Sequence, residues 1–178
     1  MSSIRDIAAA TFRRRPPKLL ALRFVFALAA AIGLGASLVP ERAEANPFCP
    51  LTQGFWKTHS TVWPTTVVTS GLTLGVVTYT QAELLTILNT PSTGDTSLIL
   101  AKQLIAAKLN YLSNTVKVLA VTVTTTDADS LLSGFSGKLP YHVAPSSATG
   151  QLMVSDATVL DIYNNGQLTP TCVPLFSG

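Results

Sequence analysis

The sequence predicts a mainly α-helical domain with a short β-ribbon, whose N- and C-terminal ends are clasped by one disulfide. Three observations predict this class. Apolar residues recur at helical spacings of three and four in several stretches between residues 80 and 163, whereas residues 72–79 read as two short strands around a glycine. The only two cysteines, Cys49 and Cys172, lie far apart in the chain.

Residues 1–45 have the three parts of a secretory signal peptide. A basic start is followed by an uncharged apolar run over residues 24–39 and by the small-x-small exit Ala43-Glu44-Ala45. We therefore expect cleavage after Ala45 and one mature domain, residues 46–178. An uncleaved anchor is the alternative, but the run is shorter than the roughly 20 residues that span a bilayer as a helix. Arg13-Arg14-Arg15 leaves both Sec and twin-arginine export open.

The charge of the chain changes sign when the leader is removed. Seven of the twelve basic residues precede position 46, so residues 46–178 keep five lysines and no arginine against six acidic residues. The net charge of +3 is therefore a property of the leader. Because arginine makes most specific contacts to phosphate and guanine, its absence argues against a nucleic-acid partner.

Cys49 and Cys172 are expected to form a disulfide, because an exported chain meets an oxidising compartment. Closing so long a loop stabilises the fold by up to roughly 4 to 5 kcal/mol in the chain-entropy model. Two free or metal-binding thiols are the alternative, which the lack of clustered ligands disfavours.

The first predicted elements are a short helix and the ribbon. Thr52 can cap a helix that Pro64 ends. Residues 65–79 are rich in Thr, Val and Gly, and the strands of the ribbon are expected within residues 72–79. One face of the short helix, at spacings i, i+3, i+4 and i+7, consists of Trp56, His59, Ser60 and Trp63.

Two longer helices are predicted next. Thr80 and Glu83 have the spacing of a capping box, and the helix that they begin carries an apolar face. Asp95 or Thr96 caps the following helix, which we expect to be the central core helix, with its two lysines on the outer side. Its continuous apolar stripe consists of Leu98, Ala101, Ile105, Leu109 and Leu112.

The C-terminal third is less uniform. Residues 114–132 leave two alternatives open, because their first half has strand propensity and their second half favours a helix. Residues 134–147 are expected to form a loop. A last helix over about residues 149–163 is followed by Asn164-Asn165-Gly166, which supplies a C-cap.

Several partial motifs complete no catalytic or metal-binding template. Asp127-x-Asp129 lacks the glycine and distal glutamate of a calcium loop, so we interpret it as a charge pair at a helix N-terminus. Residues 134–138 resemble a nucleophile elbow without its second glycine and are interpreted as a turn. His59 and His142 lie far apart with no paired histidine, so no metal site and no cofactor are expected.

One short stretch concentrates the residue types that serve recognition. Gln53, Trp56, Lys57, His59 and Trp63 combine aromatic rings with polar donors, which is what sugar- and peptide-binding surfaces use. We take these five residues as the candidate ligand-binding site. In the alternative interpretation both tryptophans are buried beneath the disulfide as part of the core.

The same stretch carries a resemblance. Residues 52–59, Thr-Gln-Gly-Phe-Trp-Lys-Thr-His, resemble the T-Q-G-[FY]-W-K-x-H signature of an uncharacterised family of exported bacterial proteins. Residues 72–75, 79–85, 103–110 and 163–166 are similar to its later blocks, so the resemblance covers nearly all of residues 49–172. The pattern more often has asparagine where this chain has Thr58.

The resemblance implies an extracytoplasmic location and a helix over residues 114–132, but it implies no activity. Members of the family can carry a surface-sorting tail, and this chain has no apolar tail before Gly178. We therefore expect it to be secreted, at the cell surface or in the periplasm, or to be held there by non-covalent contact.

Two function hypotheses follow. The first is a secreted or cell-surface-associated binding or structural module, whose partner is a cell-envelope polysaccharide or a surface protein. The second is a small extracytoplasmic hydrolase that uses His59 or His142 as a base, which requires a nucleophile or carboxylate within hydrogen-bond reach. Because the sequence contains no recognisable set of catalytic residues, the binding module is favoured.

Overall fold

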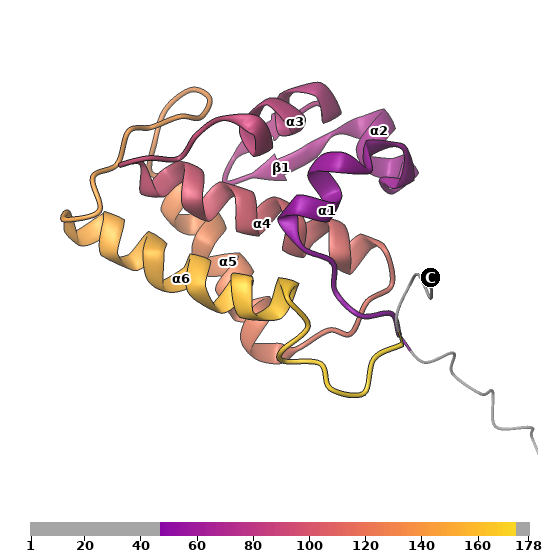
Figure 1. Ribbon diagram of the computed structural model, residues 1–178. Helices are drawn as coiled ribbons and strands as arrows, with labels where there is room; N and C mark the ends of the chain where they lie inside the picture. Colours follow the sequence, from indigo (N-terminus) through magenta and orange to yellow (C-terminus); the bar gives the residue numbers. More distant parts are fainter. Residues whose placement is uncertain (1–46, 174–178) are drawn as a thin grey trace, which may run out of the picture. The chain divides into compact units, whose positions relative to one another are not determined.

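Six α-helices, one 3-10 helix and one β-ribbon make up residues 47–173, the part of the chain that the computed structural model describes (Figure 1). In chain order they are α1 (Gln53–Thr58), η1 (Ser60–Val62), α2 (Thr65–Ser70), β1 (Leu72–Leu74), β2 (Val77–Tyr79), α3 (Gln81–Asn89), α4 (Thr96–Leu112), α5 (Leu119–Ser133) and α6 (Ala148–Asn164). The mainly helical class with a short ribbon is confirmed. The predicted leader lies outside the described residues.

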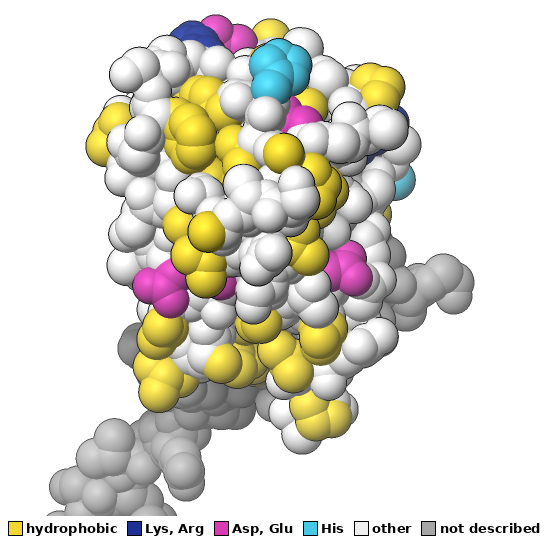
Figure 2. Space-filling view, turned by 90° about the vertical axis from the view of Figure 1, so that its left-hand side faces the viewer, with side chains coloured by type: hydrophobic (Ala, Val, Ile, Leu, Met, Phe, Trp, Pro, Cys, Tyr) yellow, Lys and Arg dark blue, Asp and Glu magenta, His cyan; other side chains and the backbone are white. Residues whose placement is uncertain are grey.

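The surface of this domain carries few charges. On the face shown in Figure 2, uncharged polar side chains and backbone dominate, and the few charged side chains include a basic and an acidic one side by side at the top. Some apolar side chains are also exposed, of which Leu119 and Val76 are the most accessible at 79% and 73%. None of the helices in residues 47–173 is long and apolar enough to cross a membrane.

Helix α4 is the centre of the core, as the sequence predicts. Asp95 caps it by accepting a hydrogen bond from the Ser97 N–H at 2.9 Å. Helices α1 and α3 and strand β1 contact it on one side, and α5 and α6 contact it on the other (Figure 1). Because neighbours surround it, burial extends well beyond the predicted stripe. Leu112, at the end of that stripe, is half exposed instead.

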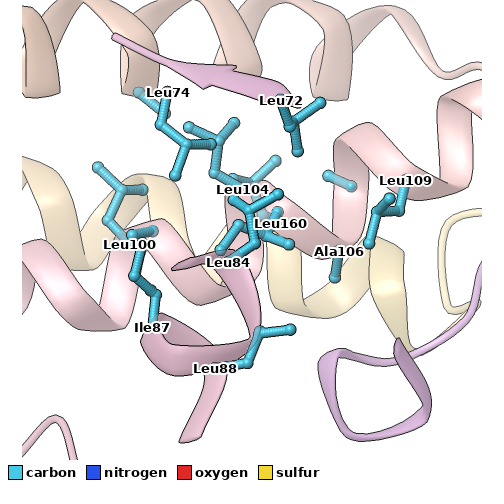
Figure 3. Close-up of a cluster of buried hydrophobic side chains, with 14 of the residues drawn as sticks. Leu72, Leu74, Leu84, Ile87, Leu88, Leu100, Leu104, Ala106, Leu109 and Leu160 are labelled. Carbon is cyan, nitrogen blue, oxygen red and sulfur yellow. The ribbon is translucent and has the colours of Figure 1, made fainter. Parts of the chain in front are cut away.

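The apolar side chains around α4 form one continuous core. Figure 3 shows aliphatic side chains of α3, the ribbon, α4 and α6 meeting in this core. Each leucine or isoleucine side chain among them contributes about 1.5 to 3 kcal/mol when it is fully buried. The labelled members are Leu72, Leu74, Leu84, Ile87, Leu88, Leu100, Leu104, Ala106, Leu109 and Leu160.

The ribbon and the capping box form as predicted. Strands β1 and β2 are antiparallel, with Leu72 opposite Tyr79 and Leu74 opposite Val77. Their alternation buries the Leu72 and Leu74 side chains and leaves Thr73 exposed. At the start of α3, Thr80 accepts a hydrogen bond from the Glu83 N–H, and the Glu83 carboxylate accepts one from the Thr80 N–H.

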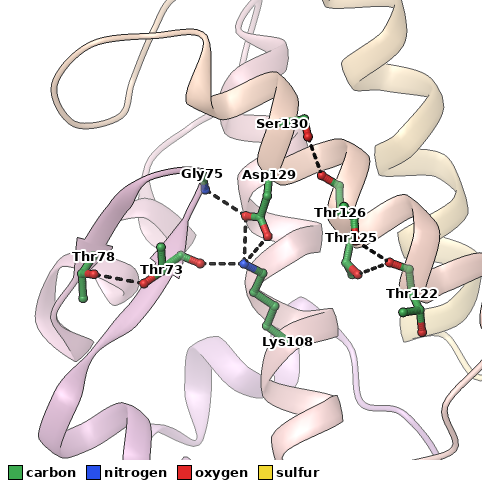
Figure 4. A network of polar contacts seen from close by, with 9 residues as sticks. All are labelled: Thr73, Gly75, Thr78, Lys108, Thr122, Thr125, Thr126, Asp129 and Ser130. Carbon is green, nitrogen blue, oxygen red and sulfur yellow. Dashed lines mark hydrogen bonds and ion pairs between the residues drawn. The ribbon is translucent and has the colours of Figure 1, made fainter.

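An ion pair joins the ribbon to α4 and α5 (Figure 4). Lys108 Nζ lies 2.6 Å from Asp129 Oδ2 and donates to the Thr73 carbonyl, while Asp129 Oδ1 accepts from the Gly75 N–H at 2.8 Å. The prediction that Asp127 and Asp129 form a charge pair at a helix N-terminus is wrong. Both lie in the second half of α5, where Asp129 fixes the hairpin turn.

Residues 119–133 form helix α5, although residues 116–124 have strand propensity. The buried positions Val121, Thr124, Thr125, Ala128 and Leu132 recur at helical spacing, so packing on α6 overrides the β-branched composition. The threonine hydroxyls donate back to carbonyls three or four residues earlier, as Thr124 does to the Ala120 carbonyl. The helix that the family resemblance implies over residues 114–132 is therefore present from Leu119 onward, whereas residues 114–118 are not helical and Thr115 forms a bridge with Phe48.

The two ends of the described chain are clasped, as predicted. Cys49 and Cys172 form a disulfide, and Phe48 forms parallel bridges to Thr115 on one side and to Val173 on the other. The Cys49 N–H donates to the Val173 carbonyl at 2.9 Å. Three segments that are distant in sequence therefore meet in one small parallel arrangement beside the disulfide.

The predicted loop and last helix are also confirmed. Residues 134–147 contain no helix or strand, and Ser147 caps α6 by accepting from the Gly150 N–H. Helix α6 buries Met153, Leu160 and Tyr163 against the rest of the domain and leaves Leu152 exposed.

Candidate functional site

Both tryptophans of the candidate site are buried. Trp56 is 1% exposed and Trp63 is 4% exposed, and the Trp63 Nε1–H donates to the Trp56 carbonyl at 2.8 Å. Neither ring can therefore stack on a ligand. The alternative interpretation, in which both tryptophans belong to the core, is the correct one. The helix expected to reach Trp63 also ends earlier, because α1 stops at Thr58 and η1 follows His59.

Trp56 belongs to a buried network of amide side chains. Asn110 Oδ1 accepts from the Trp56 Nε1–H at 3.1 Å, and Asn110 Nδ2 donates to Asn164 Oδ1 at 3.0 Å. Asn164 Nδ2 in turn donates to Gln103 Oε1 at 2.9 Å. Asn110 also bonds both backbone groups of Leu51. The network ties the segment before α1 to α4 and α6, so these residues serve the fold.

His59 is exposed but engaged by its own helix. Its ring stacks on Phe55 with centroids 4.2 Å apart, and Nδ1 lies 3.0 Å from the Phe55 carbonyl oxygen and 2.9 Å from Thr58 Oγ1. The Thr58 hydroxyl also lies within hydrogen-bond distance of the Gly54 carbonyl. No carboxylate within residues 47–173 comes within ion-pair distance of this ring, so the pair resembles a helix C-terminal cap more than a base and its nucleophile.

Gln53 and Lys57, the other two candidates, line a pocket. The pocket holds about 300 Å³ and lies between α1, α3 and α4, where it is also lined by Gly54, Leu88 and Lys102. Lys102 is half-buried, and its ammonium donates to the Thr90 carbonyl just beyond α3. We call this cavity the lysine pocket.

Burial lowers the pKa of Lys102 below its ordinary value, and the nearby positive charge of Lys57 lowers it further. The two effects are distinct: Lys102 is partly shielded from water, and the exposed Lys57 adds a like charge, with no carboxylate of residues 47–173 within ion-pair distance of either ammonium. The described residues therefore concentrate positive charge at the lysine pocket.

His142, the second histidine, lies at a different place. It sits in the loop before α6 with a positive φ of 54°, and its exposed ring has Nδ1 4.0 Å from Asp95 Oδ2. Burial raises the pKa of Asp95, but hydrogen bonds from Ser97, Val143 and His142 outweigh it, so the net pKa is lowered. The Ser97 hydroxyl is buried and donates to Asp95 Oδ1 at 2.6 Å, which makes it part of the helix cap.

A larger cavity, about 370 Å³, lies between α5 and α6 and is lined by Asp127, Ser130, Leu131, Leu152 and Asp156. Burial raises the pKa of Asp156, and the Asp127 charge adds to the rise. Within residues 47–173, no three His, Cys, Asp or Glu side chains come together as a metal-binding group. The lysine pocket is the more specific candidate, because it contains two residues that the sequence singled out.

Comparison with protein-family models, with curated proteins and with solved structures finds no match. The function must therefore follow from the geometry of the site.

Sequence reasoning finds two members of the lysine pocket and misses the third. Gln53 and Lys57 stand out beside the aromatic residues, whereas Lys102 is 45 residues further along and has no spacing relation to them. In the structure the three pocket residues lie apart from His142 and from Trp56 and Trp63, whose side chains are buried in the core. The candidate site is thus polar and cationic where the sequence suggested an aromatic surface.

Proposed function

We propose that the mature domain is a secreted or cell-surface-associated binding module that recognises glycan or other envelope material at the lysine pocket. The observation that carries this proposal is that Gln53 and Lys57 line a pocket while their polar groups are not used by the rest of the described chain. The hydrogen bonds described for residues 47–173 include none from either side chain, whereas the neighbouring Trp56 is fully used by the core.

The lining of the pocket suits a polar polymer. The Gln53 amide offers two N–H donors and one acceptor, which can pair with hydroxyl groups, and Lys57 adds a charged donor. Leu88 supplies an apolar wall, and sugars present apolar as well as polar faces. A concave site that combines a few polar groups with an apolar surface is typical of small-ligand recognition.

Three features support an extracytoplasmic location. The Cys49–Cys172 disulfide is the kind of bond that persists in oxidising compartments. The predicted leader over residues 1–45 and the resemblance to exported bacterial proteins agree with it.

The proposal is tested by co-sedimentation with insoluble cell envelope and with a panel of insoluble polysaccharides. The test compares the exported protein with a pocket variant that combines Gln53→Ala and Lys57→Ala. The matched control combines Gln151→Ala and Lys117→Ala, which make the same chemical changes at exposed positions outside the pocket.

We expect the exported protein and the control to pellet, the pocket variant to stay in solution, and soluble sugar to compete. Binding by the pocket variant equal to that of the control would overturn the proposal, as would the absence of binding to every material.

The alternative, a small extracytoplasmic hydrolase, has one feature in its favour, the Asp95 carboxylate beside His142. A hydrolase also needs a nucleophile that the histidine can reach, and the hydrogen bonds described for residues 47–173 give the His142 ring no hydroxyl partner. A screen with ester and glycoside substrates, with His142→Ala and His59→Ala as variants, separates the two functions. Turnover that depends on either histidine would favour the hydrolase.

A further inference from the structure

The five lysines of residues 47–173 divide into two groups. Lys108 pairs with Asp129, Lys138 pairs with Glu83, and Lys117 lies over the Tyr111 ring at 6.0 Å. Lys117 has no carboxylate within ion-pair distance among residues 47–173, and neither have the remaining two, Lys57 and Lys102. These two lysines line the same pocket.

Two helices fix this arrangement. Lys57 lies in the last turn of α1, and Lys102 lies on α4, so the backbone separation is set by the packing of α1 on α4. Lys102 uses one of its three N–H donors on the Thr90 carbonyl. Among residues 47–173, the other two donors have no partner and remain available to a ligand.

In the free protein, the charge of the exposed Lys57 repels the half-buried Lys102 ammonium, and neither has a carboxylate partner among residues 47–173. A bound oxyanion would remove that repulsion and would accept charge-assisted hydrogen bonds from both lysines, which are stronger than neutral ones. Gln53 can donate to the same group or to a neighbouring hydroxyl. The positive charge of the pocket therefore favours anionic polymers over neutral ones, a distinction that an uncharged pocket would not make.

We propose that the lysine pocket binds an oxyanion, a carboxylate or a phosphate, carried by an anionic polysaccharide or polyol-phosphate polymer. This inference rests on the proposed binding function and names its ligand class. Lys57 and Lys102 provide the charge, Gln53 provides a neutral donor, and Leu88 contacts the carbon skeleton next to the anionic group.

The test measures binding of the exported, disulfide-bonded protein to three soluble polymers. Polygalacturonate presents carboxylates, poly(glycerol phosphate) presents phosphates, and dextran is neutral. Lys57→Gln and Lys102→Gln remove one pocket charge each. Lys117→Gln is the control, because it makes the same charge change at an exposed lysine outside the pocket.

We expect at least one anionic polymer to bind more tightly than dextran, and binding to weaken about tenfold or more in each pocket variant, equivalent to about 1.4 kcal/mol. The Lys117→Gln control should stay within about twofold of the unmodified protein, and added salt should weaken binding. Preference for polygalacturonate identifies a carboxylate, and preference for the phosphate polymer identifies a phosphate.

A second measurement does not depend on the folding of variants. In protein with isotope-labelled lysine, added inorganic phosphate or acetate should shift the side-chain NMR signals of Lys57 and Lys102 and leave that of Lys117 in place. Equal shifts at all three lysines would overturn the inference.

The failure of the inference can be told apart from the failure of the proposed function. If dextran binds as well as the anionic polymers and the lysine variants bind normally, the domain is a binding module but the oxyanion site is wrong. If no polymer binds and neither anion shifts the pocket lysines, both are wrong.

Discussion

Replacing Asn110 with alanine is the sharpest test of how this fold is held together. Asn110 is fully buried, and its amide makes four hydrogen bonds: from the Leu51 N–H at 2.8 Å, from the Trp56 indole at 3.1 Å, to the Leu51 carbonyl at 2.9 Å and to Asn164 Oδ1 at 3.0 Å. Each bond contributes about 1 kcal/mol net, so losing all four should cost about 4 kcal/mol. That is a large part of the 5 to 15 kcal/mol typical of a whole domain.

The assay is urea unfolding with the disulfide intact, followed by tryptophan fluorescence. Trp56 and Trp63 are the only tryptophans in the chain and both are buried, so their emission reports directly on this region. Asn165→Ala is the control, because Asn165 is exposed and, among residues 47–173, its side chain bonds only to Asp161. We expect the control to lose less than about 1 kcal/mol.

Asn110→Leu separates hydrogen bonding from packing. Leucine fills the space but leaves the same four groups unpaired, so it should remain as destabilised as the alanine variant. If Asn110→Ala loses less than about 1.5 kcal/mol, or if leucine restores stability, the amide network does not have the role assigned to it.

Three other predictions concern the clasp, the capping box and one glycine. Reducing the disulfide, which joins residues 123 apart, should lower the free energy of unfolding by up to about 5 kcal/mol in urea titrations with and without reductant. The hydrogen bond from Lys138, with those from Thr80, lowers the pKa of Glu83 to about 2. The ionised Glu83 carboxylate therefore stabilises the fold fully above about pH 4.5, and this stabilisation is lost as the pH falls toward 2. The melting temperatures of the unmodified protein and of Glu83→Gln should accordingly converge at acidic pH. Gly150→Ala should be strongly destabilising in thermal melts, because a Cβ there would lie 2.1 Å from the Ala144 carbonyl oxygen.

Each of these has an outcome that contradicts it. A change below about 1 kcal/mol on reduction would mean that the clasp adds little beyond the bridges of Phe48. A melting difference for Glu83→Gln that is the same at every pH would exclude a role for the charge of Glu83. Gly94→Ala serves as the control for Gly150, since no atom of the described part of the chain lies within 4 Å of its added Cβ, although its φ of 74° adds some strain. Equal losses at the two glycines would show that the close contact is not the cause.

Local signals predict much of this fold. The capping box of Thr80 and Glu83 involves residues only three apart, and the ribbon alternates around Gly75, so both are readable without knowledge of the rest. Residues 119–124 are different, because β-branched side chains favour strands in isolation. The packing of α5 on α6 stabilises the helix instead, and the buried residues of α5 recur at helical spacing.

The candidate site shows the same division. The stretch around Trp56 stands out in composition, but composition does not tell whether a tryptophan faces solvent or core. The indole of Trp56 packs in the core, where Asn110, 54 residues later, accepts a hydrogen bond from its N–H. Lys102 joins Lys57 through the packing of α1 on α4, for which the sequence contains no spacing signal.

The clasp also determines how the domain would respond to mechanical load. Cys49 and Cys172 have Cα atoms only 4.8 Å apart, and they lie just inside residues 47 and 173. Tension applied to the backbone at those two residues would therefore pass through the sulfur–sulfur bond and bypass the helices between them. While the bond is intact, the domain would add almost no length to a chain under force. Reduction would release the full contour of the enclosed residues.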